Sequence, residues 1–136
     1  MGRNIGAGIL GVVVAVALVW VIEMLGHSIY PPPPGLDFSD PAAMKSYVDS
    51  LPIGALLSVA IAWFAGALGG TFAACRLGAA KSIVFAPIIG GLMFVGAAIN
   101  FATIPHPLWF LIIGIAGIIL GAWLGMFLGT RGSEAT

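Results

Sequence analysis

The sequence predicts an all-α integral membrane protein, a bundle of four transmembrane helices with a proline-rich outer loop that carries a short amphipathic helix. Of its 136 residues, 60% are hydrophobic and 7% are charged, whereas a soluble domain usually carries about 25% charged residues. So few charges cannot cover a water-facing surface, which excludes a soluble domain. Four segments are also apolar over nearly the length of a spanning helix, roughly 20 residues.

The four predicted spans belong to one domain covering residues 1–136. They comprise residues 5–26, 51–75, 82–100 and 108–129, and residues 28–50 form the outer loop. Arg3 precedes the first span, as a basic residue precedes the apolar part of a signal peptide. The span is longer than the roughly 7–15 residues of that part, and no A-x-A site follows it. We therefore expect the first span to be retained.

The placement of charges predicts the orientation in the membrane. With four spans, four of the five basic residues share one side: Arg3, Arg76, Lys81 and Arg131. The fifth, Lys45, shares the outer loop with Asp37, Asp40 and Asp49. The positive-inside rule then places both termini in the cytoplasm. No basic cluster points to nucleic acid as a partner, so the expected partner is the lipid bilayer.

The outer loop has two predicted parts. Pro31 to Pro34 should form a stiff polyproline II segment. A short helix should follow, with Asp40 or Ser39 as its cap and Pro41 at its first position. One apolar stripe at helical spacing makes this helix amphipathic, and its residues are Met44, Tyr47, Val48 and Leu51. We expect it to lie on the membrane surface or over the bundle.

Small residues recur every four positions in three of the spans. The last span has Gly117, Gly121, Gly125 and Gly129, the second has Gly66, Gly70 and Ala74, and the first has Ala7, Gly11 and Ala15. Small residues let helix backbones approach closely within a bilayer. These faces therefore predict packing inside the bundle, with contacts between subunits of a homo-oligomer or a larger membrane complex, or a glycine-lined pore, as alternatives.

A shift of 55 residues aligns the second span with the fourth. It matches Pro52, Leu56, Gly66, Ala67, Gly70, Phe72 and Arg76 to Pro107, Leu111, Gly121, Ala122, Gly125, Phe127 and Arg131. Since these two spans run in the same direction, the pattern suggests two hairpins related by an axis along the membrane normal.

The stretch "EMLGHSIYPPPPG", residues 23–35, holds the polar residues of greatest interest. Glu23 is the one charged residue within the predicted apolar segments, and His27 follows it at a spacing that puts both on one helix face. Topology brings Asn100, at the end of the third span, and His106, in the last outer loop, to the same side. We expect these four residues to form a site for a proton or a small ligand.

Three readings of this cluster stay open. Glu23, His27 and His106 supply the donor set of a two-histidine, one-carboxylate site for a divalent metal such as zinc, iron or manganese. They also suit a proton or substrate site, or a purely structural role at the interface. Cys75 and the four tryptophans are expected to serve packing or the interfacial belt. The sequence shows no catalytic serine–histidine pattern, phosphate loop or haem-attachment motif.

The stretches "EMLGHSIYPPPPGLD", "LPIGALL" and "IPHPLWF" together resemble a family of small bacterial four-span membrane proteins of hypothetical function, over nearly the whole chain. The resemblance implies a bacterial inner membrane and no activity. The chain is also similar to the small multidrug resistance exporters, which have four short spans and a carboxylate in the first. It departs from them because Glu23 lies near the outer end and the first outer loop is long, so this likeness concerns the fold alone.

Three classes of function follow from these observations. The first is a non-enzymatic bundle with a polar pocket in the outer leaflet, which binds a proton, a metal or a small ligand for transport or sensing. The second is a structural or accessory subunit that packs through its glycine faces. The third is a membrane enzyme that acts on lipid-linked substrates, which the lack of a catalytic motif makes the least favoured.

Overall fold

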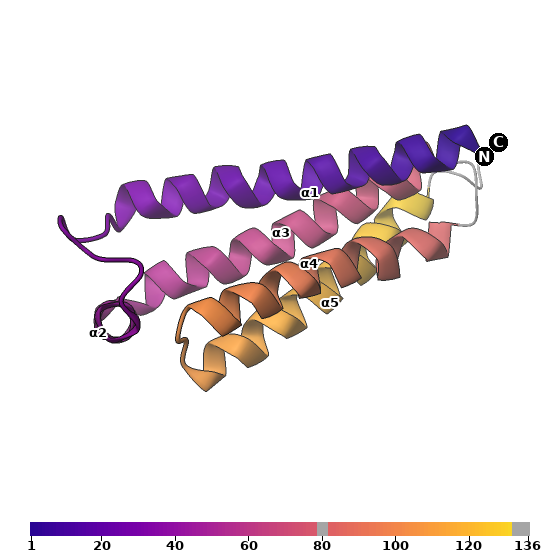
Figure 1. The fold of residues 1–136 in the computed structure, drawn as a ribbon. Helices are drawn as coiled ribbons and strands as arrows, with labels where there is room; N and C mark the ends of the chain where they lie inside the picture. Colours follow the sequence, from indigo (N-terminus) through magenta and orange to yellow (C-terminus); the bar gives the residue numbers. More distant parts are fainter. Residues whose placement is uncertain (79–81, 132–136) are drawn as a thin grey trace.

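The computed structural model describes residues 1–78 and 82–131, and these form a helical bundle (Figure 1). Its helices are α1 (Gly2–Ile29), α2 (Pro41–Ser50), α3 (Ile53–Leu77), α4 (Phe85–Thr103) and α5 (Leu108–Thr130), with a 3₁₀ turn η1 (Ser82–Val84) before α4. All but α2 are long and apolar enough to cross a membrane. The predicted fold class is therefore confirmed, and the helix bounds lie within a few residues of the predicted spans.

Large apolar side chains cover the outside of the bundle. Ile9, Val16, Trp20, Ile112 and Ile119 are each more than half exposed. In water this surface would be unfavourable, but lipid tails are as apolar as these side chains. The surface therefore suits a bundle surrounded by lipid.

The central helix of the bundle is α3, which packs against α1, α4 and α5. Its contact with α1 is antiparallel and depends on glycine. A methyl group on Gly70 would lie 2.6 Å from the Gly11 carbonyl oxygen, and one on Gly66 would lie 2.9 Å from the Ala15 carbonyl oxygen. Both distances are too short for real carbon atoms, so the two backbones approach this closely because side chains are absent.

The contact between α3 and α5 is parallel and uses the glycines of α5. A methyl group added to Gly121 would lie 2.5 Å from the Phe64 carbonyl oxygen. One added to Gly125 would lie 3.0 Å from the Phe72 nitrogen, and one added to Gly129 would lie 2.7 Å from the Cys75 Cβ. Gly117 differs, because a methyl group there would meet Phe64 at an ordinary 3.7 Å. The glycine faces of α3 and α5 thus lie against helices of the same chain.

The two halves of the apparent repeat use their glycines differently. Gly66 and Gly70 of α3 face α1, whereas their counterparts Gly121 and Gly125 of α5 face α3. If a two-fold axis related the α1–α3 pair to the α4–α5 pair, Gly121 would instead lie against α4. The glycine face of α3 therefore lies against an antiparallel helix and that of α5 against a parallel one, so the sequence repeat does not become a two-fold symmetric bundle.

The two ends of the bundle differ in chemistry. At one end, here called the basic end, α1 begins and α3 and α5 end (Figure 1). Arg3 donates a hydrogen bond from Nε to the Leu77 carbonyl oxygen at 2.9 Å, and Arg131 stacks over the Phe127 ring. Lys81, which the sequence places on the same side, lies outside the described residues. The opposite end carries α2 (Figure 1) and is called the pocket end below.

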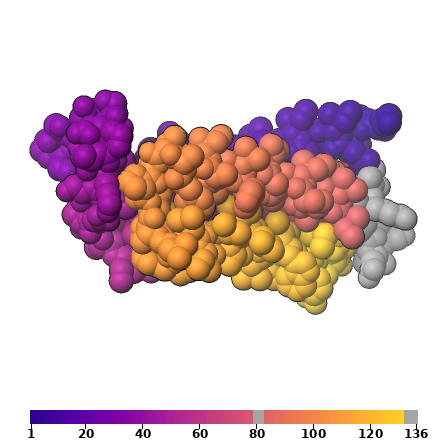
Figure 2. All heavy atoms as spheres, turned by 60° about the horizontal axis from the view of Figure 1, so that its bottom comes forward, coloured from indigo at the N-terminus to yellow at the C-terminus, as the bar shows by residue number. Residues whose placement is uncertain are grey.

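The predicted amphipathic helix is α2, and its local signals act as expected. The Asp40 side chain caps it by accepting from the Ala42 N–H, and Pro41 occupies the first turn. Met44 and Val48 are buried, while Lys45 and Asp49 form an exposed ion pair of 2.7 Å on the other side of the helix. Figure 2 shows the segment that contains α2, in purple, covering the end of the bundle beside the turn between α4 and α5.

Candidate functional site

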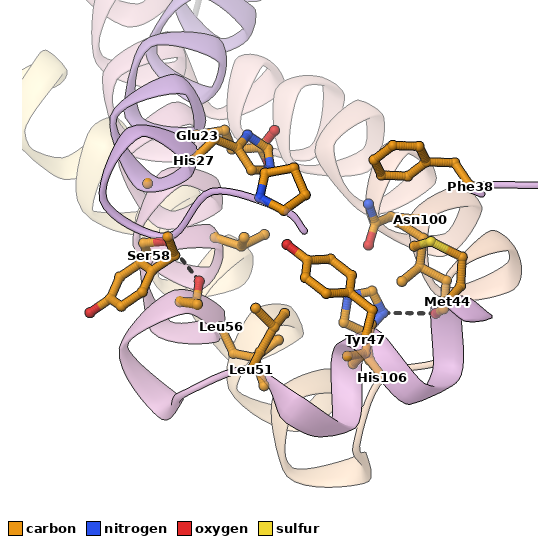
Figure 3. Close-up of a pocket in the computed structure, with 17 residues that line it drawn as sticks. Glu23, His27, Phe38, Met44, Tyr47, Leu51, Leu56, Ser58, Asn100 and His106 are labelled. Atoms are coloured by element: carbon orange, nitrogen blue, oxygen red, sulfur yellow. Dashed lines mark hydrogen bonds between the residues drawn. The ribbon is translucent and has the colours of Figure 1, made fainter. Parts of the chain in front are cut away.

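A pocket of about 470 Å³ opens at the pocket end of the bundle. Its walls come from the end of α1, the proline-rich segment, α2, the first turns of α3, and the α4–α5 turn (Figure 3). Its volume lies within the range of ~300–1,000 Å³ typical of small-molecule sites. The four residues predicted to form a site all line it, and they are Glu23, His27, Asn100 and His106. Segments that are distant in the sequence therefore meet in one cavity.

Glu23 is half-buried at the pocket wall. It interacts electrostatically with His27, one turn further along α1, and it accepts a side-chain hydrogen bond from Trp63 of α3. Since the indole nitrogen of tryptophan can only donate, the carboxylate is the acceptor. A carboxylate near the membrane needs partners of this kind, because an unpaired charge in lipid is costly.

The partner of Glu23 is itself held rigidly by packing. Trp63 is 5% exposed, and its ring lies edge-on to Phe101 at 5.4 Å between centroids and tilted to Phe110 at 5.5 Å. Gly114 of α5 leaves room for the indole, because a methyl group there would lie 2.9 Å from the ring. The sequence indicated a packing role for Trp63 but did not indicate that it also positions Glu23.

His106 lies in the turn between α4 and α5, and its neighbours set its hydrogen-bonding state. Its Nδ1 is 2.8 Å from the Ile104 carbonyl oxygen, and its ring stacks on Phe110 with 4.7 Å between centroids. Because a carbonyl can only accept, Nδ1 carries the hydrogen. Burial lowers the pKa of His106, and the hydrogen bond to Ile104 opposes this shift in part. The neutral ring keeps Nε2 as an acceptor.

Asn100 lies in the last turn of α4 and extends toward the pocket (Figure 3). Its Oδ1 is buried and has no hydrogen-bond partner among the described residues. Leaving a buried acceptor unpaired costs about 1–3 kcal/mol, and most buried polar side-chain atoms are satisfied. Asn100 Oδ1 is therefore an unsatisfied acceptor beside the cavity.

The divalent-metal prediction is not supported by the arrangement of these side chains. Among the described residues, no group of three His, Cys, Asp or Glu side chains lies close enough together to hold a metal ion. Glu23 and His27 project from α1, whereas His106 is held on another wall by its contacts with Ile104 and Phe110 (Figure 3). The three residues share a pocket but do not form a metal centre.

Several pocket residues were not predicted as parts of a site. Tyr47, Met44 and Val48 of α2 form one wall, so the apolar stripe of that helix is turned toward the cavity. Tyr30 forms another part of the wall and sets its hydroxyl against Gly54, at the start of α3. The stripe was visible in the sequence, but what it would cover was not.

Comparisons with protein families, with characterised proteins and with solved structures find no match to this chain. The resemblance to a small bacterial four-span family therefore stays a prediction. The geometry of the pocket is what bears on the function of the chain.

Proposed function

We propose that the protein is a small inner-membrane protein of bacteria whose pocket at the outer leaflet binds a proton or a small ligand, for transport or sensing. The observation that carries this proposal is the convergence of Glu23, His27, Asn100 and His106 on one open cavity. They come from the first helix, the fourth helix and the last turn. Such a pocket, apolar with a few convergent polar groups, is the usual form of a binding site.

The orientation belongs to the same proposal. Arg3, Arg76 and Arg131 lie at or near the basic end, where α1 begins and where α3 and α5 end. The positive-inside rule assigns this end to the cytoplasm. The pocket then faces the periplasmic side, where Lys45 is accompanied by three aspartates.

The alternative function, a structural subunit that packs through glycine, receives less support. Gly66 and Gly70 contact α1, and Gly121, Gly125 and Gly129 contact α3. These faces are thus occupied within one chain and do not present a surface for a partner. A homo-oligomer or a membrane complex would have to use other faces, and this expectation stays a prediction.

The proposal is tested by ligand-induced stabilisation, because a ligand that binds the folded state raises its melting temperature. The purified protein in a non-ionic detergent is heated with small cationic, neutral and anionic probes at several pH values. We compare it with Val59→Trp, which adds a ring where a valine lines the pocket. Val13→Trp is the matched control, because Val13 is exposed on the outer face of α1.

The expected result is that at least one probe raises the melting temperature of the wild type and of Val13→Trp but not of Val59→Trp. A proton site would instead appear as a pH-dependent change in melting temperature that Glu23→Gln removes while the fold is kept. If no probe and no change of pH distinguishes Val59→Trp or Glu23→Gln from the wild type, the pocket is not a binding site.

A further inference from the structure

Several polar groups on the pocket wall are hydrogen-bond acceptors. The Glu23 carboxylate and Asn100 Oδ1 can only accept hydrogen bonds, and the second has no partner among the described residues. His106 adds Nε2, because its Nδ1 hydrogen is used by Ile104. Ser58, which also lines the pocket, gives its hydroxyl hydrogen to the Ala55 carbonyl oxygen at 2.7 Å, so its oxygen can serve a ligand only as an acceptor. Acceptors of this kind are satisfied by a ligand that donates.

The charges at this end favour a cation. Among the described residues that line the pocket, none is Lys or Arg, and Glu23 is the one acidic residue. Outside the pocket, residues 30–51 carry Asp37, Asp40 and Asp49 against Lys45 alone. An excess of negative charge around an opening raises the local concentration of cations. An anionic ligand would instead meet Glu23 without a Lys or Arg partner among the described lining residues.

The remaining walls define the rest of the ligand. Phe38, Met44, Leu51, Leu56 and Val59 are apolar and lie around the polar groups. Tyr47 turns an aromatic ring toward the same space (Figure 3), and aromatic faces attract cations. The cavity therefore offers both a polar position and apolar surface for a substituent.

We propose that the pocket binds a primary or secondary ammonium ion with an apolar substituent, which pairs with Glu23 and donates a hydrogen bond to Asn100 Oδ1. This inference depends on the proposed binding function and specifies its ligand. An N–H donor is essential to it, because a quaternary ammonium has the charge but cannot satisfy the orphan oxygen of Asn100. The ammonium group belongs either to a free amine or to an ethanolamine lipid headgroup, since both present the same chemistry to the outer leaflet.

The test measures the binding of four probes by isothermal titration calorimetry, with the full chain in a non-ionic detergent. Hexylammonium has the charge and the donors, and trimethylhexylammonium has the charge alone. Hexanol is neutral and hexanoate is anionic. We expect hexylammonium to bind at least ~10-fold more tightly than the other three, which is the size of one charge-assisted hydrogen bond.

Variants locate the interaction. Asn100→Leu should weaken hexylammonium binding ~10-fold or more and leave the weak binding of trimethylhexylammonium unchanged. Asn100→Asp keeps an acceptor at this position, so it should bind hexylammonium at least as tightly as the wild type. This variant tests the role of the acceptor if Asn100→Leu does not fold. Thr103→Val is the matched control, because Thr103 lies in the same turn of α4, is exposed and does not line the pocket.

Nanodiscs then distinguish the two sources of the ammonium group. If hexylammonium binds more weakly in nanodiscs with phosphatidylethanolamine than in nanodiscs of phosphatidylglycerol alone, the lipid headgroup competes for the pocket. If the two affinities agree, the ligand is a free amine. Either result is consistent with the ammonium assignment.

Two outcomes would overturn the assignment. Equal binding of hexylammonium and trimethylhexylammonium, or tighter binding of hexanol or hexanoate that Val59→Trp removes, would show that the pocket binds another class of ligand, and the proposed function would stand. No binding of any of the four probes to the folded wild type would remove the ammonium assignment. Together with a negative stabilisation screen, it would remove the proposed function as well.

Discussion

The indole N–H of Trp63 donates to the carboxylate of Glu23 across the contact between α1 and α3. This bond links the one acidic residue within the apolar segments to a tryptophan packed against Phe101 and Phe110. The pocket wall is thus continuous with the core of the bundle. A change in the core at this point should therefore be felt at the candidate site.

Removal of this hydrogen bond should destabilise the bundle. Trp63→Phe keeps an aromatic ring in the core but removes the donor, so we expect the free energy of unfolding to fall by about 1–3 kcal/mol, the cost of losing a hydrogen bond to a charged group. Reversible unfolding in mixed detergents measures it. Trp123→Phe is the control, because Trp123 is 52% exposed on α5 and should change stability little. Equal losses in the two variants would mean that the bond to Glu23 contributes nothing.

The close contact between α3 and α5 should not tolerate a side chain at Gly121. The added methyl group of Gly121→Ala would lie 2.5 Å from the Phe64 carbonyl oxygen, so one backbone must move, at a cost of about 1–3 kcal/mol. Gly91→Ala is the matched control, since nothing lies within 4 Å of a methyl group there and alanine favours a helix over glycine. Melting temperatures in detergent should fall for Gly121→Ala alone. A similar melting temperature for both variants would contradict the packing described for α5.

A substitution at Thr71 should preserve or increase stability, in contrast to the two substitutions above. Its side chain is fully buried in α3, and its Oγ1 has no hydrogen-bond partner among the described residues. Valine has nearly the same shape without the hydroxyl, so Thr71→Val should preserve stability or increase it by about 1 kcal/mol, because an unpaired buried hydroxyl is unfavourable. The same unfolding assay measures this effect. A clear loss of stability would show that the hydroxyl has a partner that matters, such as a ligand or a second chain.

Acid should destabilise the pocket end through His106. Burial lowers the pKa of this imidazole below its ordinary value of 6.5, so the unfolded chain takes up a proton at a higher pH than the folded chain does. The stability due to the neutral ring is thus complete above about pH 6.5 and is lost as the pH falls toward the lower folded-state pKa. His106→Phe keeps an aromatic ring for stacking on Phe110 and should lose less melting temperature between pH 7.5 and pH 5. Parallel pH profiles for the variant and the wild type would contradict this role.

The orientation can be tested with single cysteines in a Cys75→Ser background. A membrane-impermeant thiol reagent added outside intact bacterial cells should label Lys45→Cys but not Arg131→Cys, because the positive-inside rule places the basic end in the cytoplasm. Labelling of both positions after cell lysis shows that both cysteines are reactive. Labelling of Arg131→Cys from outside would reverse the orientation and turn the pocket toward the cytoplasm.

The sequence by itself determined the membrane-spanning class, the number of long helices and the position of α2. These follow from local signals: a chain with 7% charged residues needs an apolar solvent, and Asp40 with Pro41 starts a helix wherever the chain places them. Alternation of direction from span to span then brings Glu23, His27, Asn100 and His106 to one end. Topology alone was therefore enough to predict that these four polar residues share one end of the bundle.

Only the tertiary structure decided which surfaces meet. Small residues permit close approach but do not select a partner, so the glycine pattern could not show that Gly66 faces α1 while Gly121 faces α3. The rotation of each helix about its axis likewise decided that Trp63 reaches Glu23 and that Phe110 holds the His106 ring. Sharing one end of a bundle places side chains within the width of a helix pair, whereas hydrogen bonds and metal coordination require contact. For this reason the meeting of Glu23, His27, Asn100 and His106 was predictable, and their bonds were not.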